Sequence, residues 1–232
     1  MKVLVACEES QRVCKAFRDR GHKAYSCDIQ QCSGGHPEWH IKGDVLPLLN
    51  GNCSFVTEGG EIVTILGKWD LIIAHPPCTY LTNAANRVYS LDKTPADKVV
   101  ERWQNRARAA IFFMRFVGAD CEKICIENPI GFMNNNYQKP TQIIQPYYFA
   151  SSVEDQENYH IKTTCLWLKG LPPLERTTNL EKPQYEKYWS EYAKKYKSKV
   201  WAEYGKATNG NRAKNRSVTF QGIADAMAAQ WG

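Results

Sequence analysis

A cysteine on a rigid loop is the first feature of this 232-residue sequence that points to chemistry. Cys78 follows Pro76 and Pro77, directly after a short apolar run. Each proline fixes its own φ angle, so the thiol is held on a stiff turn at a strand end. A thiolate in such a place can add covalently to a flat, electron-poor ring. Addition to carbon 6 of a cytosine lets carbon 5 accept a methyl cation, so Cys78 is the candidate nucleophile.

Carboxyl groups supply the other half of this chemistry. An acid must hold ring nitrogen 3 and the exocyclic amine, and we expect burial to raise the pKa of Glu127 for that role. Asp28 can accept hydrogen bonds from the ribose hydroxyls of a donor, and Asp44 can accept one from an adenine amine. Taken singly, Cys78 could be a buried structural thiol, Glu127 a local cap, and each aspartate the end of a strand.

Strand and helix signals alternate through the first half of the chain. Apolar runs predict strands at 3–6, 24–27, 40–45, 69–74 and 123–126, and helical spacing predicts helices over 11–20 and 96–117. This alternation is typical of an α/β fold with a doubly wound, mostly parallel sheet. Ligands bind at the carboxyl ends of such strands, so the polar residues that follow each run should converge on one crevice.

The second half is less regular and is interrupted by prolines. Its patterns predict a strand over 160–169, a helix over 185–204 and a closing helix over 219–231. We expect residues 1–130 to form the catalytic domain. Residues 131–215 would form a small basic insertion, and residues 216–232 would return to the catalytic domain.

Positive charge is concentrated near the end of the chain. Residues 182–216 hold ten lysines and arginines against three glutamates, whereas the whole chain has a net charge of +6. Aromatic residues lie among the lysines: Tyr185, Tyr188, Trp189, Tyr192, Tyr196, Trp201 and Tyr204. Lysines suit contacts to phosphate, and aromatic rings suit stacking on bases. The segment therefore predicts nucleic-acid binding, with a solvated helix face as the alternative.

Cysteine usage and hydropathy indicate a cytoplasmic protein. The nine cysteines include no Cys-x-x-Cys pair, which favours a reducing compartment over a disulfide framework. No apolar run approaches the roughly 20 residues of a membrane span. The spacing of Cys27, Cys32, His36 and His40 resembles a zinc site. Cys27 and His40 belong to predicted strands, however, so we expect no metal.

Together, these motifs resemble the DNA cytosine-5 methyltransferase family, most closely its short, phage- and bacterium-associated members. Pro-Cys at 77–78 resembles the catalytic motif of that family, and Glu-Asn-Pro at 127–129 resembles its Glu-Asn-Val motif. Asp28 and Gly-Asp at 43–44 match acidic residues near its second and third strands. Residues 216–222, Arg-Ser-Val-Thr-Phe-Gln-Gly, resemble its last motif. The matches occur in family order and span most of the chain.

The resemblance implies a Rossmann-like methyltransferase that uses S-adenosyl-L-methionine on DNA, in the cytoplasm of a bacterium or a phage-infected host cell. Cys78 and Glu127 would be catalytic. The donor would contact Cys7, Glu8, Glu9, Ser10, Asp28, Ile29, Asp44, Val45 and Pro76. The target base would contact Pro77, Asn128, Lys162 and Thr164. Lys162 would stand in for an arginine of the family.

The loop over residues 6–11 departs from the family pattern, because it holds no glycine where the family has Phe-x-Gly-x-Gly. Two alternatives follow. The chain could be a carbon-5 transferase acting on RNA or on pyrimidine nucleotides. It could also be a non-catalytic nucleic-acid-binding protein that kept the fold and lost the donor.

Overall fold

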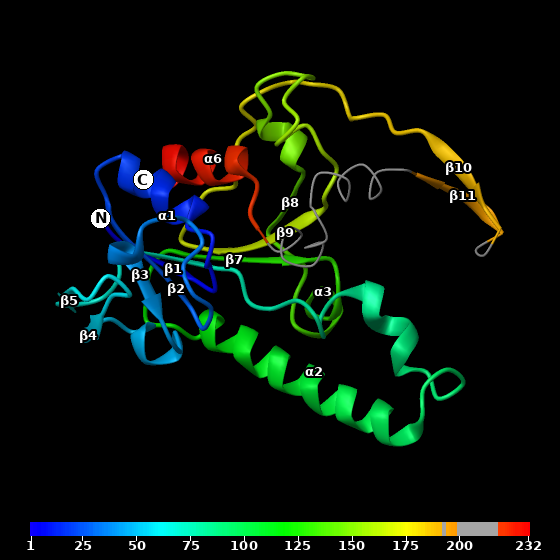
Figure 1. Ribbon diagram of the computed structural model, residues 1–232, viewed down its shortest axis with the longest axis horizontal. Helices are drawn as coiled ribbons and strands as arrows, with labels where there is room; N and C mark the ends of the chain where they lie inside the picture. Colours follow the sequence, from blue (N-terminus) through cyan, green and yellow to red (C-terminus); the bar gives the residue numbers. More distant parts are fainter. Residues whose placement is uncertain (192–193, 199–217) are drawn as a thin grey trace.

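The computed structural model describes residues 1–191, 194–198 and 218–232 and has an α/β fold. Seven strands form one mixed, mostly parallel sheet in the order β3-β2-β1-β6-β7-β9-β8 (Figure 1). The parallel strands are β1 (Lys2–Ala6), β2 (Lys23–Asp28), β3 (His40–Lys42), β6 (Leu71–Ala74) and β7 (Ile124–Pro129). Strand β9 (Thr164–Lys169) runs antiparallel to β7, and β8 (Gln142–Ile144) antiparallel to β9. This sheet is compatible with a Rossmann-like fold.

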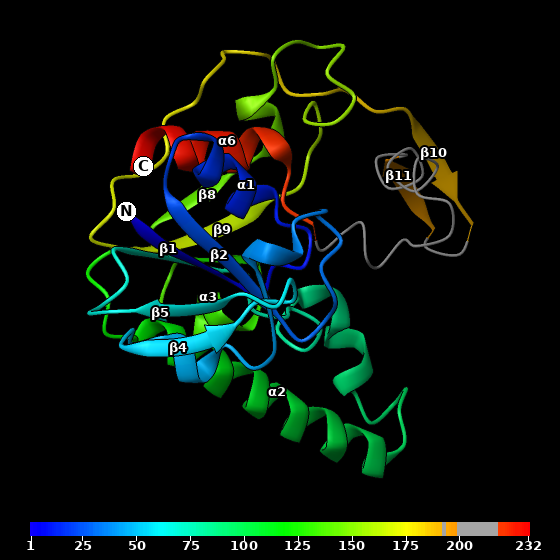
Figure 2. The same ribbon diagram turned by 60° about the vertical axis from the view of Figure 1, so that its left-hand side comes forward.

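Helices cover both faces of the sheet (Figures 1 and 2). Helices α1 (Arg12–Asp19) and α6 (Gln221–Trp231) lie on one face, and α2 (Ala96–Val117) and α3 (Phe132–Asn136) lie on the other. Side chains of β1 alternate between the two cores: Val3 and Val5 join the cluster under α1 and α6, and Leu4 and Ala6 join the one above α2. Burial on both faces explains the unbroken apolar runs of the sequence.

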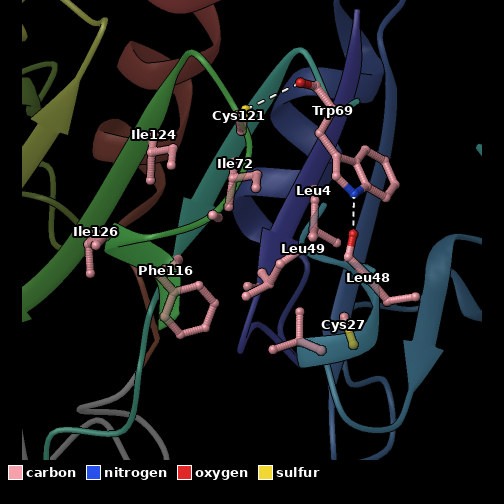
Figure 3. Close-up of a cluster of buried hydrophobic side chains, with 14 of the residues drawn as sticks. Leu4, Cys27, Leu48, Leu49, Trp69, Ile72, Phe116, Cys121, Ile124 and Ile126 are labelled. Atoms are coloured by element: carbon pink, nitrogen blue, oxygen red, sulfur yellow. Dashed lines mark hydrogen bonds between the residues drawn. The ribbon is translucent and has the colours of Figure 1, made fainter. Parts of the chain in front are cut away.

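Trp69 anchors the approach to β6 in the core on the α2 side (Figure 3). Its indole Nε1–H donates to the backbone oxygen of Leu48 at 2.7 Å, and its own backbone oxygen accepts from the thiol of Cys121 at 3.2 Å. A buried indole needs such a partner for its N–H group. The start of β6 is thereby fixed between two other segments of the chain.

Short elements fill the connections. The 3₁₀ helices are η1 (Pro37–Trp39), η2 (Leu46–Leu48), η3 (Asn83–Tyr89) and η4 (Pro146–Phe149). Strands β4 (Cys53–Val56) and β5 (Ile62–Ile65) form an antiparallel hairpin outside the main sheet. No pattern in the sequence predicted this hairpin, because its strands are short and largely exposed.

The helix predicted over residues 185–204 is wrong where that range is described. Strands β10 (Lys187–Ser190) and β11 (Lys195–Ser198) pair antiparallel there, and the hairpin extends away from the sheet (Figures 1 and 2). Tyrosine and tryptophan favour extended backbone, and Trp189 stacks edge-on against Tyr196 across the pair at 5.3 Å. Local propensity and cross-strand packing therefore outweigh the helical spacing.

Most other predicted elements of the sheet are confirmed. The helix over residues 96–117 has the predicted bounds, and the five parallel strands occur in the predicted order. The sheet continues past residue 130, since β8 and β9 both belong to it. In the part of the chain that the structure describes, no helix is both long and apolar enough to cross a membrane.

Candidate functional site

The sheet has a topological switch point between β1 and β6. Strand β1 pairs with β2 on one side and with β6 on the other, so the loops after β1 and β6 diverge at their carboxyl ends. Such a divergence opens the crevice in which α/β proteins bind their ligands. The loop after β1 carries Glu8 and Glu9, and the loop after β6 carries Cys78. The candidate site is therefore at this edge of the sheet.

The loop that carries Cys78 is fixed at both ends. His75 extends the pairing of β1 and β6, because its backbone N–H donates to the oxygen of Ala6 at 2.9 Å. After the two prolines, the backbone oxygen of Cys78 accepts from the amides of Leu81 and Thr82, each at 2.9 Å. The partly buried thiol is thus held between a strand end and a tight turn.

Hydrogen bonds join the Cys78 loop to the strand that carries Glu127. The side-chain amide of Asn128 donates to the backbone oxygen of Pro76 at 2.7 Å. Further along, the amide of Phe132 donates to the oxygen of Leu81 at 2.6 Å, and Thr82 forms a bridge with Gly131. The structure therefore brings the loops of the two predicted catalytic residues together.

Glu127 lies near the carboxyl end of β7, with its side chain 15% exposed. Its Oε2 lies 3.2 Å from Nδ1 of His75, and the charge of Lys162 also acts on it. Burial by itself raises the pKa of Glu127, but the hydrogen bond from His75 and the positive charge of Lys162 outweigh it. The pKa lies below its ordinary value, so the expected rise is wrong for the free protein.

Arg106 of α2 holds the chain just beyond Cys78. Its Nε–H donates to the backbone oxygen of Tyr80 at 2.9 Å, and its NH2 group donates to the side chain of Asn86 at 2.8 Å. The guanidinium lies 3.6 Å from the ring centroid of Tyr89. Arg106 is buried, and a buried guanidinium has to satisfy its donors within the fold. It therefore anchors the segment over residues 80–89 on α2.

The loop after β1 adopts left-handed backbone without glycine. Cys7 has φ 61° and Gln11 has φ 58°, a conformation that costs little for glycine and more for other residues. Both carboxylate oxygens of buried Glu8 accept from amides at the start of α1, Val13 at 2.7 Å and Cys14 at 3.2 Å. The carboxylate thus takes the place that a phosphate would take at a helix N-terminus.

The rest of that loop is tied to the segment after β2. Glu9 is buried, and its carboxylate accepts from the hydroxyl of Ser33, whose backbone N–H also donates to the oxygen of Glu9. Ser10 is partly exposed beside it. Burial strongly raises the pKa of the Cys7 thiol, and the nearby Asp28 and Cys27 add to the effect. Cys7 is therefore a neutral thiol in this loop.

The acidic residues at the end of β2 and after β3 are accessible. Asp28 is partly exposed, and its Oδ1 accepts from the backbone N–H of Gln30 at 2.8 Å. Ile29 beside it is a large apolar side chain that is 78% exposed. Asp44 is exposed, whereas Val45 is buried in the core on the α2 side. Asp28, Ile29 and Asp44 are thus open to a ligand, whereas Val45 is not.

The predicted base-contacting residues differ in exposure. Pro77 is exposed, whereas Pro76, which was predicted to contact the donor, is buried. Lys162 is partly buried, with Nζ 3.5 Å from the oxygen of Val218 and 5.4 Å from the ring centroid of Phe220. Thr164 is buried, and its hydroxyl donates to the oxygen of Lys162 at 3.2 Å. The charge of Lys162 acts on Glu127, and the hydroxyl of Thr164 holds the backbone at Lys162.

The residues with zinc-like spacing have other partners. Cys32 donates its thiol hydrogen to Oε1 of Gln11, and His40 lies between the hydroxyl of Ser26 and the oxygen of Gln30. Within the described ranges, no group of three or more histidine, cysteine or acidic side chains is placed to hold a metal ion. None of the nine cysteines, all of which are described, forms a disulfide.

Much of the basic region, residues 192–193 and 199–217, lies outside the described residues. This gap includes Arg216 and Ser217 of the predicted last motif, and Tyr192, Trp201 and Tyr204. The described hairpin leaves Tyr188 and Trp189 44% and 46% exposed, and Tyr196 68% exposed. These rings lie outside the core, and they stand on a pair of strands rather than on the helix face that the alternative assumed.

Sequence reasoning missed two residues beside the site, His75 and Arg106. A signal existed for His75, because it directly precedes the prolines of the Cys78 loop at a strand end. Arg106 carried no signal, since one arginine on a charged helix resembles its exposed neighbours. No protein-family model and no curated protein matches the sequence. The geometry of the site is therefore the basis for a functional proposal.

Proposed function

We propose that the protein transfers a methyl group from S-adenosylmethionine to carbon 5 of cytosine in DNA, with Cys78 as the nucleophile and Glu127 as the group that holds the base. One observation carries the proposal. The loop of Cys78 and the strand of Glu127 are joined by the 2.7 Å hydrogen bond from Asn128 to Pro76, at the switch point of the sheet. A thiol and a carboxyl group on adjoining strand ends suit opposite edges of one pyrimidine.

The residues of the crevice fit the proposed donor better than a phosphate-bearing nucleotide. Glu8 already occupies the N-terminus of α1, so a phosphate there would meet a carboxylate. Asp28 and Asp44 are accessible acceptors for ribose and adenine, and exposed Ile29 offers an apolar surface to a ring. Such an acidic crevice attracts a cationic ligand. When bound, S-adenosylmethionine supplies an electrophilic methyl group on a positively charged sulfur.

Cys78 makes the target carbon reactive. Its thiolate forms a bond to carbon 6 of cytosine, and the ring electrons shift to carbon 5. Carbon 5 would then accept the methyl group that the bound donor supplies, and the carbon–sulfur bond of the donor would break. Loss of the proton from carbon 5 to a base restores the ring and releases the thiolate. Pro76, Pro77 and the turn after Cys78 hold the sulfur in place throughout.

Glu127 orients the base. As an ionised carboxylate it can accept a hydrogen bond from the exocyclic amine of cytosine. Entry of the flat base removes water from the carboxyl group, and desolvation favours the protonated form. That proton can then be shared with ring nitrogen 3, which draws electrons away from carbon 6. Lys162 lies near enough to act on the same carboxylate.

The projecting hairpin supports a polymeric substrate rather than a free nucleotide. Its exposed rings at Trp189 and Tyr196 suit stacking on unpaired bases, and the sequences of β10 and β11 also contain lysines. A cytosine in a duplex must leave the stack to reach a thiol at a strand end, at a cost of a few kcal/mol. Contacts to the unstacked strand would offset that cost.

Transfer of a tritiated methyl group tests the proposal. The protein is assayed with S-adenosylmethionine and duplex DNA, single-stranded DNA, RNA or free cytidine nucleotides. We expect label in DNA with the native protein and with Cys53→Ala, whose thiol lies on β4 outside the main sheet. We expect none with Cys78→Ala. Label in RNA or nucleotides alone would favour the other transferases, and failure to bind the donor would favour a non-catalytic protein.

A further inference from the structure

His75 stands at the switch point of the sheet, three residues before Cys78. It extends the pairing of β6 with β1, since its backbone N–H donates to Ala6 at 2.9 Å. Its side chain is only 6% exposed. A histidine in this place is ionisable, buried and directed toward the site.

The imidazole of His75 holds the carboxylate of Glu127. Nδ1 lies 3.2 Å from Oε2 of Glu127 and 3.5 Å from the hydroxyl oxygen of Thr219. An ionised carboxylate can only accept, so Nδ1 carries the proton. Nε2 is buried and has no hydrogen-bond partner among the described residues. A buried ring nitrogen without a hydrogen-bond partner destabilises the fold. That this cost is accepted here indicates a functional reason for the imidazole.

A second carboxyl group lies near the same imidazole. Burial raises the pKa of Glu8 on the loop after β1, and the charge of His75 is the strongest influence that opposes this rise. The charge of His75 therefore acts on a carboxyl group of the loop after β1 as well as on the carboxylate of β7.

The charged and titratable groups around Glu127 come from several elements. His75 follows β6, and Lys162 precedes β9. The thiols of Cys125 on β7 and Cys165 on β9 also feel the charge of Glu127, and burial keeps both thiols neutral by raising their pKa. The charge of Lys162 acts on Glu127, and Nδ1 of His75 meets the carboxylate at a hydrogen-bond distance of 3.2 Å.

We propose that His75 is a positioning residue: its Nδ1–H holds one oxygen of Glu127 in place and sets the pH at which that carboxyl group takes up the proton for the cytosine. The 3.2 Å contact between Nδ1 and Oε2 is the evidence for this role. That the role serves methyl transfer rests on the proposed function. Without the imidazole, the carboxylate loses a donor and is more easily protonated. Glu127 would then be protonated at higher pH, before the base arrives.

The titration of Glu127 tests this inference without any substrate. Carboxyl-labelled glutamate is followed by ¹³C NMR against pH, and Glu127→Gln assigns the signal. In His75→Ala we expect the pKa of Glu127 to rise, because the carboxylate loses the hydrogen bond from Nδ1. His75→Leu repeats the measurement with a side chain of similar bulk and decides the matter if the alanine variant does not fold. His75→Asn, which keeps an N–H near the position of Nδ1, should restore part of the native value.

His22 offers the matched control, because it lies beside the N-terminus, at the opposite end of β1. His22→Ala should leave the titration of Glu127 unchanged. An unchanged pKa of Glu127 in both His75→Ala and His75→Leu would overturn the inference. So would an equal rise in the His22 variant.

The pH dependence of methyl transfer separates this role from a merely structural one. If Glu127 must be protonated, the rate falls as pH rises through its pKa in the complex. Loss of the imidazole moves this fall to higher pH, whereas general damage to the fold lowers the rate equally at every pH. If the native protein transfers no methyl group, the proposed function fails, and the NMR titration still decides the role of His75.

Discussion

The side-chain amide of Asn128 donates a hydrogen bond to the backbone oxygen of Pro76 at 2.7 Å. This contact is one of those that join the strand of Glu127 to the loop of Cys78, and both of its groups are buried. Removal of the donor leaves the oxygen of Pro76 buried without its partner, which costs about 1–3 kcal/mol. The contact therefore ties the stability of the fold to the geometry of the proposed active site.

Asn128→Ala should lower the free energy of unfolding by about 1–3 kcal/mol. It should also reduce the rate of methyl transfer by a larger factor than it reduces the affinity for the donor. Chemical denaturation, a donor titration and single-turnover methylation measure the three quantities. Asn136→Ala is the control, because the exposed amide of Asn136 only bonds to Phe132 within its own short helix. Equal losses of stability and of methyl transfer in the two variants would show that the Asn128–Pro76 contact does not position the active site.

Gly131 lets the two loops approach each other. A Cβ atom at this position would lie 1.9 Å from the backbone oxygen of Leu81, so a side chain must push the loops apart. Gly131→Ala should lower the unfolding free energy by about 1–3 kcal/mol and reduce methyl transfer. In Gly118→Ala the added atom meets only an ordinary 3.6 Å contact, and this variant should resemble the native protein. Thermal unfolding of both variants makes the comparison.

Arg106 should control the rate through the loop that follows Cys78. Arg106→Met keeps the apolar stem but loses the hydrogen bonds to Tyr80 and Asn86. Charge-assisted hydrogen bonds contribute about 1.5–3 kcal/mol, so kcat should fall roughly tenfold to a hundredfold while donor affinity stays close to native. Arg108→Met on the exposed side of α2 is the control. An unchanged kcat in Arg106→Met would rule out the anchoring role.

The exposed rings of the hairpin should bind unpaired bases. Trp189→Ala and Tyr196→Ala should each weaken binding to single-stranded DNA about tenfold, since stacking on one base contributes about 1–3 kcal/mol. Trp189→Phe and Tyr196→Phe keep an aromatic face and should bind nearly as the native protein does. Fluorescence anisotropy with a labelled oligonucleotide measures the affinities. Native affinity for single-stranded DNA in both alanine variants would show that the hairpin does not bind unpaired bases.

The sequence predicted the sheet well because its strands are buried on both faces. Runs such as Leu71–Ala74 are apolar throughout, and this pattern depends on burial rather than on any one partner. Alternation of strands and helices then fixes where the carboxyl ends lie. For that reason the region of Cys78, Asp28 and Glu127 could be predicted without coordinates.

What the sequence could not predict depends on contacts between distant residues. The pKa of Glu127 follows from His75, 52 positions earlier, and from Lys162, so an expectation from burial alone had the wrong direction. Glycine-free backbone at Cys7 and Gln11 is left-handed because the surrounding loop imposes it, against local preference. The β10–β11 hairpin depends on cross-strand pairing that a helical spacing concealed.

A covalent trap with DNA that contains 5-fluorocytosine tests the central claim most directly. Fluorine at carbon 5 cannot leave as a proton does, so the bond between Cys78 and carbon 6 persists after methyl transfer. The native protein should form an adduct stable in denaturing gels, dependent on S-adenosylmethionine, with the modified peptide containing Cys78. Cys78→Ser should form none, and Cys53→Ala should form as much as native. An adduct in Cys78→Ser, or attachment at another cysteine, would contradict the account.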